Sequence, residues 1–86
     1  MTETAKVIDG GNRGCGELLL QLRSEARRLP GGSVLRLIAT DPAAPDDLPR
    51  WCAMTGHSFL STSLAPDGRP AFDIGVRANN DTRSTA

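Results

Sequence analysis

The chain has 86 residues, 38% of them hydrophobic. A chain this short buries only roughly 60 to 70% of its unfolded surface, so it supports one domain with one modest core. Ten basic and ten acidic side chains cancel, so no overall field attracts nucleic acid or an anionic membrane, and direct nucleic-acid binding is not expected. No apolar run approaches the ~20 residues of a membrane helix, and the first residues lack the pattern of a signal peptide. We therefore expect a cytoplasmic protein with no membrane partner and with reduced cysteines.

The first half of the chain predicts a strand, a helix and a second strand. Residues 6–9 are short and β-branched at their centre, which is typical of a brief strand, and a glycine-rich loop over 10–14 follows. Between residues 17 and 29, apolar side chains recur at steps of three and four, which predicts an amphipathic helix that Pro30 ends. The apolar run over 33–40 is typical of a central strand, with Arg36 near its exposed face.

A proline-rich turn precedes the second predicted helix. Asp46 or Asp47 is expected to cap this helix, whose first turn accommodates Pro49 and whose end is set by Gly56. Together with Asp41, these aspartates could also supply a carboxylate pair for acid–base chemistry, but capping explains them without it. One face of the helix carries Leu48, Trp51, Cys52 and Thr55.

Two further strands complete the predicted fold. They cover residues 57–64 and 71–77 and are joined by a turn over 66–69. The order β-α-β-α-β-β predicts an α/β (α+β) two-layer sandwich, in which both helices pack on one face of a four-stranded mixed sheet. We expect residues 1–5 to form an N-terminal tail, 6–77 a single domain and 78–86 a disordered C-terminal tail.

Cys15 lies between two glycines just before the first predicted helix. Unpaired backbone N–H groups and the helix dipole at this position favour negative charge and would stabilise a thiolate. Arg13 is expected to add to that effect and Glu17 to oppose it. Gly14 and Gly16 leave the sulfur sterically open. The alternative is that Cys15 only fills a small space at the helix start.

The other candidate residues are interpreted as structural. Cys52 follows Trp51 on the buried side of the second helix and is expected to be a packed thiol. A redox pair with Cys15 is discounted, because the two are not in a C-x-x-C arrangement. His57, the only histidine, and Cys52 give two potential ligands where a structural zinc site needs four, so no metal is expected. We expect His57 to cap helix carbonyls or to lie at the surface.

Several features together resemble the TusA/SirA family of small sulfur-carrier proteins over residues 6–77. They are the strand ending at Asp9, the cysteine six residues later at the head of a helix, the closing Phe/Ile/Val strand and the central string PGGSVLRLIATDPAAPDDLPRWCAMTGH. The resemblance implies a sulfurtransferase or sulfur-relay protein rather than a stand-alone enzyme. In it Cys15 accepts sulfane sulfur as a persulfide, and Asp9 matches the aspartate that starts the family motif.

The resemblance also implies the partners. The donor would be a cysteine desulfurase or a rhodanese-like protein, and the acceptor another sulfur-relay protein in tRNA thiolation, cofactor biosynthesis or sulfur oxidation. No cofactor is needed.

The chain departs from the family pattern at the cysteine. Members typically have Cys-Pro-x-Pro, whereas this chain has Cys15-Gly16-Glu17-Leu18, and the usual glycine three residues after the aspartate is Asn12. A proline after the cysteine would pre-organise the helix start, so Gly16 should make the thiol loop more mobile.

This departure motivates an alternative function. The fold would serve as a non-catalytic binding or regulatory module in which Cys15 is a remnant. Arginines around the first helix could then form a docking face, although an ordinary solvated helix face explains them as well: Arg13, Arg23, Arg27 and Arg28.

Overall fold

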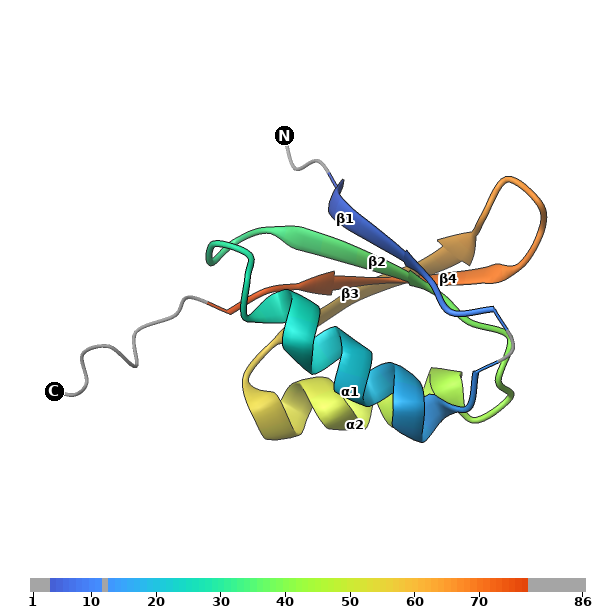
Figure 1. Ribbon diagram of the computed structural model, residues 1–86, viewed down its shortest axis with the longest axis horizontal. Coiled ribbons are helices and arrows are strands. Elements are labelled where there is room, and N and C mark those ends of the chain that lie inside the picture. Colours follow the sequence, from blue (N-terminus) through green and yellow to red (C-terminus); the bar gives the residue numbers. More distant parts are fainter. Residues whose placement is uncertain (1–3, 12, 78–86) are drawn as a thin grey trace, which may run out of the picture.

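The computed structural model describes residues 4–11 and 13–77, and of Cys15 it describes only the backbone. The predicted tail over 78–86 and Asn12 lie outside these residues. The elements follow the predicted β-α-β-α-β-β order (Figure 1): β1 (Thr4–Asp9), α1 (Cys15–Ala26), β2 (Val34–Ile38), α2 (Ala44–Thr55), β3 (Ser58–Leu64) and β4 (Pro70–Gly75).

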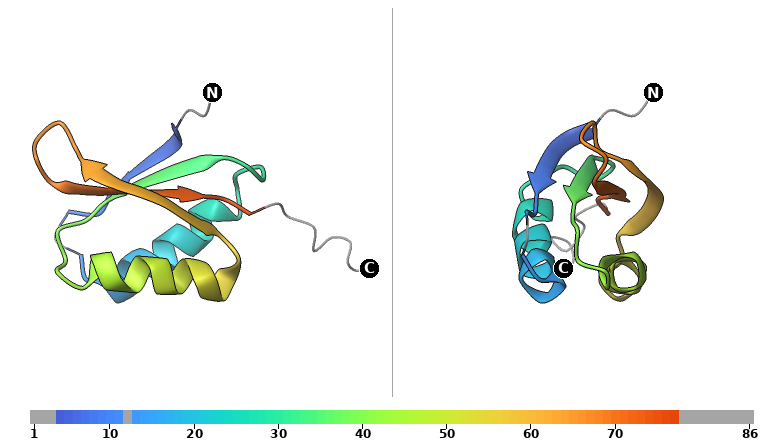
Figure 2. Two further views of the ribbon diagram at one scale, coloured as in Figure 1. Left: turned by 180° about the vertical axis from the view of Figure 1, so that it is seen from behind. Right: turned by 90° about the vertical axis from the view of Figure 1, so that its right-hand side faces the viewer.

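The four strands form one mixed sheet in the order β1-β2-β4-β3. The β1 strand runs parallel to β2, and β4 runs antiparallel to both of its neighbours. Both helices lie side by side on the same face of this sheet, as the two views of Figure 2 show. The predicted two-layer sandwich is therefore confirmed.

The core lies between the helix layer and the sheet. Alternating side chains of each central strand point toward the helices, because successive residues of a strand face opposite sides. Arg36 faces the other way and forms an ion pair with Asp73 on the neighbouring strand, with 2.7 Å between Nε and Oδ1. It is thus paired and partly buried rather than simply exposed. The largest fully buried side chains are Phe72, Leu18, Leu22, Leu35, Leu37, Leu48, Ile74 and Cys52.

The ends of β1 and α1 differ from the prediction. The β1 strand begins at Thr4, within the expected N-terminal tail, and α1 begins at Cys15 rather than at residue 17. The helix ends at Ala26, because the next residues form hydrogen bonds that span three residues instead of four. The N–H of Arg28 donates to the Glu25 carbonyl at 3.0 Å, and the N–H of Leu29 donates to the Ala26 carbonyl at 3.2 Å. The proline at position 30 disfavours helical geometry in the residue before it, so the helix cannot continue through this segment.

The predicted capping of α2 is wrong. The helix begins at Ala44, and its cap residue Ala43 donates its N–H to Oδ1 of Asp41 at 2.8 Å. Asp46 and Asp47 lie in the first turn, where their charge suits the helix dipole but no side-chain cap forms. Because the helix starts early, the proline at position 49 lies inside the helix instead of in its first turn.

The predicted end of α2 at Gly56 is confirmed. Gly56 is the cap residue and adopts a left-handed conformation with φ of 85°. Within the part of the chain that the structure describes, neither helix has the length and apolar character needed to cross a membrane.

Candidate functional site

The loop that leads to Cys15 is packed tightly against the end of β2. The N–H of Gly10 donates to the carbonyl of Ile38 at 2.8 Å. A Cβ atom at Gly10 would lie 2.7 Å from Cδ2 of Leu18 and 2.8 Å from the carbonyl oxygen of Ile38. Only glycine fits at this position, so the start of the loop is fixed in place by sheet and helix together.

Cys15 is the first residue of α1, and Gly14 is its cap residue with extended backbone angles. The N–H of Leu18 donates to the Gly14 carbonyl at 3.1 Å and closes the first helical turn. Among the described residues, none accepts a hydrogen bond from the N–H groups of Gly16 or Glu17. Within the described part of the chain, these two backbone donors near Cys15 are thus unpaired, and unpaired N–H groups at a helix start favour an anion.

Asp9 is held by an arginine that sequence reasoning missed. Both carboxylate oxygens of Asp9 accept from Arg69, at 2.8 and 2.9 Å, and Oδ1 also accepts the N–H of Gly11 at 3.0 Å. These bonds lower the pKa of the Asp9 carboxyl to about 2, with the Arg69 hydrogen bonds as the largest cause. Arg69 also donates to Asp67 at 2.8 Å. This network ties the end of β1 to the turn between β3 and β4, sixty residues away in the chain.

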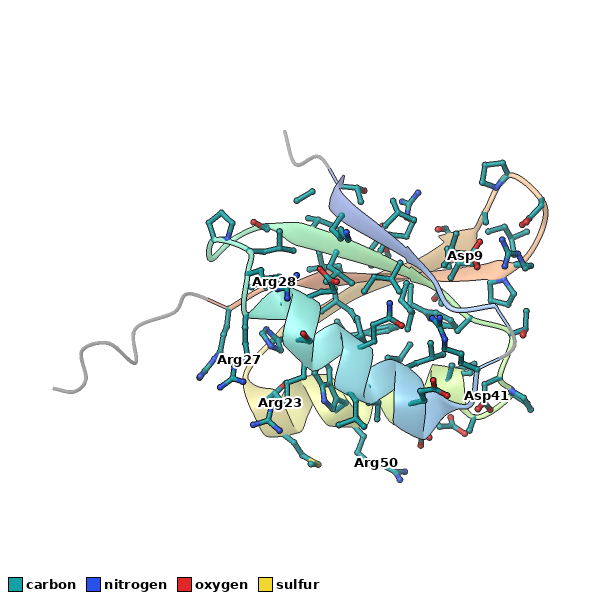
Figure 3. The ribbon with its side chains drawn as sticks, in the orientation of Figure 1. Asp9, Arg23, Arg27, Arg28, Asp41 and Arg50 are labelled. Carbon is teal, nitrogen blue, oxygen red and sulfur yellow. The ribbon has the colours of Figure 1, made fainter. Side chains whose placement is uncertain are left out.

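Arg13 and Glu17 pair with each other beside the helix start. Their Nε and Oε2 atoms lie 3.7 Å apart, and Nη1 of Arg13 donates to Oε1 of Gln21 at 2.9 Å. Each charge is thus partly offset by the other. A further carboxylate borders this end of α1, because a Cβ atom at Gly14 would lie 3.9 Å from Oδ2 of Asp41. Figure 3 shows Asp9 and Asp41 at the end of the molecule where α1 begins.

The prediction for Cys52 is confirmed. Its side chain is 2% exposed, and burial raises the pKa of the thiol to about 11. A thiol with such a pKa stays protonated near neutral pH and is a poor nucleophile.

The prediction for His57 is correct in part, because its side chain is partly exposed but does not cap the helix. Its Nδ1 accepts the backbone N–H of Arg77 at 3.0 Å, so the ring joins the end of α2 to the end of β4 instead of capping a carbonyl. The ring stacks on Trp51 with 5.1 Å between centroids, and burial followed by the charge of Arg77 lowers the pKa of His57. Within the described residues, no three histidine, cysteine or acidic side chains come together in a way that could hold a metal ion.

The predicted arginine set is divided between the two ends of α1. Arg13 lies at the start of the helix, whereas Arg23 and Arg27 line a groove of about 690 Å³ at its end. Figure 3 shows Arg28 and Arg50 also on the helix layer. The docking face considered in the alternative function is therefore not formed by all four arginines.

Comparison with known proteins finds one family model and many related sequences. The family described as Sulfurtransferase TusA matches residues 6–69. The Sulfur carrier protein TusA of Pseudomonas entomophila is 38% identical over 53 residues, which cover 62% of this chain and 66% of that protein. The protein of the same name from Pseudomonas putida strain GB-1 is 37% identical over 54 residues, covering 63% and 68%. The chain thus spans about two thirds of the length of these curated relatives.

Proposed function

Because the chain belongs to the TusA family, we propose that it is a sulfur carrier in which Cys15 receives sulfane sulfur as a persulfide and passes it to an acceptor protein. The observation that carries this proposal is the place of Cys15 as the first residue of α1, inside the segment that the family model matches. A helix start favours a negative charge on sulfur, which is the state that a sulfur nucleophile needs.

The proposed reaction is an exchange between persulfides and thiolates. The Cys15 thiolate attacks the terminal sulfur of a donor persulfide, so that a new S–S bond forms at Cys15 while the S–S bond of the donor breaks. The donor cysteine leaves as a thiolate. In the second step an acceptor thiolate attacks the terminal sulfur and releases the Cys15 thiolate. The sulfur atom moves with no net oxidation, so the relay needs no cofactor.

The residues around Cys15 have distinct proposed roles. The N–H groups of Gly16 and Glu17, which have no acceptor among the described residues, would stabilise negative charge at the sulfur. The absence of side chains at Gly14 and Gly16 would leave room for a partner's cysteine. Arg13 moderates the charge of Glu17 through their ion pair. Asp9, held by its arginine partner, would fix the start of the loop.

The proposed partners are proteins. A cysteine desulfurase or a rhodanese-like protein would supply the sulfur, and another sulfur-relay protein would accept it, in a route such as tRNA thiolation, cofactor biosynthesis or sulfur oxidation. We place this relay in the cytoplasm, where thiols are kept reduced and a persulfide can be exchanged.

The proposal is tested by intact-mass measurement after incubation with a cysteine desulfurase and cysteine, or with a thiosulfate-based donor. We expect an adduct of one sulfur atom on the full chain and on the Cys52→Ala variant. The Cys15→Ser variant should gain none. Absence of an adduct on the native chain, or an adduct that persists in Cys15→Ser, would contradict the proposal.

The alternative function, a binding module with Cys15 as a remnant, predicts the opposite dependence. In that case Cys15→Ser would leave partner binding and the cellular phenotype intact. The observation that favours a binding role is the groove at the end of α1, which Arg23 and Arg27 line.

A further inference from the structure

A groove runs between the C-terminal ends of the two helices and the end of β4. Its volume is about 690 Å³. Its residues come from both helices, from the segments that follow each of them and from the end of the sheet. The lining consists of Arg23, Ala26, Arg27, Leu29, Trp51, Met54, Thr55, His57, Val76 and Arg77.

The groove has a strong excess of positive charge. It is lined by three arginines and no acidic residue. None of these three guanidinium groups forms an ion pair with any described residue, whereas the arginines at positions 13, 36 and 69 each do. The chain has no net charge, so this excess is a local property of the groove.

The negative ends of the helix dipoles offset only part of the positive charge of the arginines. Both helices end at the groove, and each C-terminus carries about half a negative charge, which gives about one negative charge in total. Three guanidinium groups therefore leave about two positive charges in excess. Arg77 follows the last strand and belongs to neither helix. Arg28 and Arg50 also lie on the helix layer but do not line the groove (Figure 3).

The groove also offers a hydrogen-bond donor and an apolar side. Because Nδ1 of His57 accepts the backbone N–H of Arg77, the neutral ring carries its proton on Nε2, and this N–H can be donated to an acceptor in the groove. Met54 is 78% exposed, and Leu29 packs only partly against the core. A ligand that fits this lining carries negative charges together with an apolar group.

We propose that this groove docks a carboxylate-rich peptide segment, bearing at least one apolar side chain, of the protein that exchanges sulfur with Cys15. The carboxylates pair with Arg23, Arg27 and Arg77, and the apolar side chain packs on Met54 and Leu29. The identity of the docked protein as a sulfur partner rests on the proposed function, but the peptide-binding groove itself does not.

A peptide fits these features better than a nucleic acid. Sequence-tolerant binding of single strands relies on open aromatic faces for base stacking. The single tryptophan of the chain is only 9% exposed and its ring is already stacked on His57. Carboxylates, by contrast, match the fork of a guanidinium group and accept two parallel hydrogen bonds from it.

The position of the groove suits a protein that reaches Cys15. The α1 helix has 12 residues, so its two ends lie ~17 Å apart. A partner that places an acidic segment in the groove can lay a neighbouring loop along α1 and present its own cysteine at the helix start.

The test is a titration of the full chain carrying Cys15→Ser, which cannot exchange sulfur, so the result is independent of the proposed function. The probe is a short synthetic peptide of glutamates with a central leucine, and the readout is the fluorescence of Trp51, which lines the groove. We expect saturable binding that weakens as salt is raised, and no binding of the same peptide with glutamine in place of glutamate.

Two double variants with the same change in net charge provide the decisive comparison. Arg27→Gln with Arg77→Gln removes two groove charges and should weaken binding about tenfold. Arg28→Gln with Arg50→Gln removes two charges outside the groove and should weaken it less than about twofold. Equal losses in both variants, or no saturable binding, would overturn the proposal. Tighter binding of oligouridylate or of anionic vesicles, with the same dependence on Arg27 and Arg77, would overturn the assignment to a peptide.

Discussion

The two ends of α1 differ in how their charges are satisfied. At the N-terminal end two ion pairs form, Asp9 with Arg69 and Glu17 with Arg13, and the Asp41 carboxylate lies close to Gly14. The backbone at this end has two N–H groups, near Cys15, from which no described residue accepts a hydrogen bond. At the C-terminal end, backbone N–H groups of the next residues bond to the carbonyls of Arg23, Glu25 and Ala26, while the guanidinium groups around the groove have no ion-pair partner within the described residues.

This difference indicates that the two ends of α1 are suited to different tasks, sulfur binding at one end and partner docking at the other. In the proposed function, the N-terminal end holds the small anionic persulfide, because backbone N–H groups act only at close range. The C-terminal end is suited to attract a larger acidic surface, because arginine side chains reach outward and act over a Debye length. Each end can be tested separately by substitution, and the expected effects range from several kcal/mol at the helix start to small changes at exposed ion pairs.

The largest effect is expected from Leu18→Pro at the N-terminal end. Leu18 is fully buried and its N–H donates to the Gly14 carbonyl, so proline removes both core packing and the bond that closes the first turn. We expect a loss of about 4 kcal/mol in the free energy of unfolding, measured by urea denaturation.

The matched control is Gly16→Pro, which restores the first proline of the family pattern. Gly16 lies in the first turn, and outside its chain neighbours and the backbone of its own helix no described atom lies within 4 Å of a Cβ built there. Its N–H has no described acceptor, so proline should change stability by less than about 1 kcal/mol. Equal losses for both variants would mean that the first turn of α1 is not closed by the bond between Leu18 and Gly14.

The next effect is expected from Gly10→Ala, which tests whether the loop before Cys15 is rigidly packed. The new methyl group would collide with the carbonyl of Ile38, which cannot move without disturbing β2. We expect a loss of about 3 kcal/mol in urea denaturation. Gly16→Ala is the control and should be neutral or should stabilise the chain by about 0.5 kcal/mol, because alanine is the better helix former. A tolerated Gly10→Ala would show that the loop can relax.

A smaller effect is expected at the C-terminal end when the pH is lowered. The folded pKa of His57 lies below its ordinary value of 6.5, so its contribution to stability is complete above 6.5 and is lost as the pH falls through the folded value. The midpoint of thermal unfolding should therefore fall over this range. His57→Asn keeps an acceptor near the Arg77 N–H but cannot titrate, and should remove this drop. A drop of unchanged size in His57→Asn would assign the titration to another group.

The smallest change in stability is expected from Arg69→Lys, because the pairs that it breaks are exposed. Lysine keeps the charge but loses the two parallel bonds to Asp9. By NMR titration, the pKa of Asp9 should rise from about 2 toward its ordinary 3.8, and the amide of Gly11 should exchange faster with solvent. A pKa of Asp9 that stays near 2 would mean that the Gly11 bond alone holds the carboxylate.

Local patterns in the sequence were sufficient for the order of the elements and for the packed state of Cys52. These features depend on residues that are close together in the chain, namely apolar side chains at helical spacing and glycine or proline at the ends of elements. The same patterns also placed Cys15 at a helix start, although the start itself lies two residues earlier than the spacing indicated. The cap of α2 was missed, because Asp41 satisfies the turn from outside the helix.

The site features that sequence reasoning missed all depend on contacts between distant segments. The turn that contains Arg69 was predicted, but its bonds to Asp9 join residues sixty positions apart. The groove required both helix ends and the end of β4 to come together. No local pattern encodes which arginines find a carboxylate in the fold and which do not.

The most direct test of the division between the two ends is the rate of sulfur transfer measured against the concentration of the donor protein. We predict that Arg27→Gln with Arg77→Gln raises the half-saturating donor concentration about tenfold and leaves the maximal rate within about twofold, because the groove holds the partner while the Cys15 end is unchanged. Cys15→Ser should abolish transfer. A fall in the maximal rate at an unchanged half-saturating concentration, or transfer that persists in Cys15→Ser, would contradict this division of tasks.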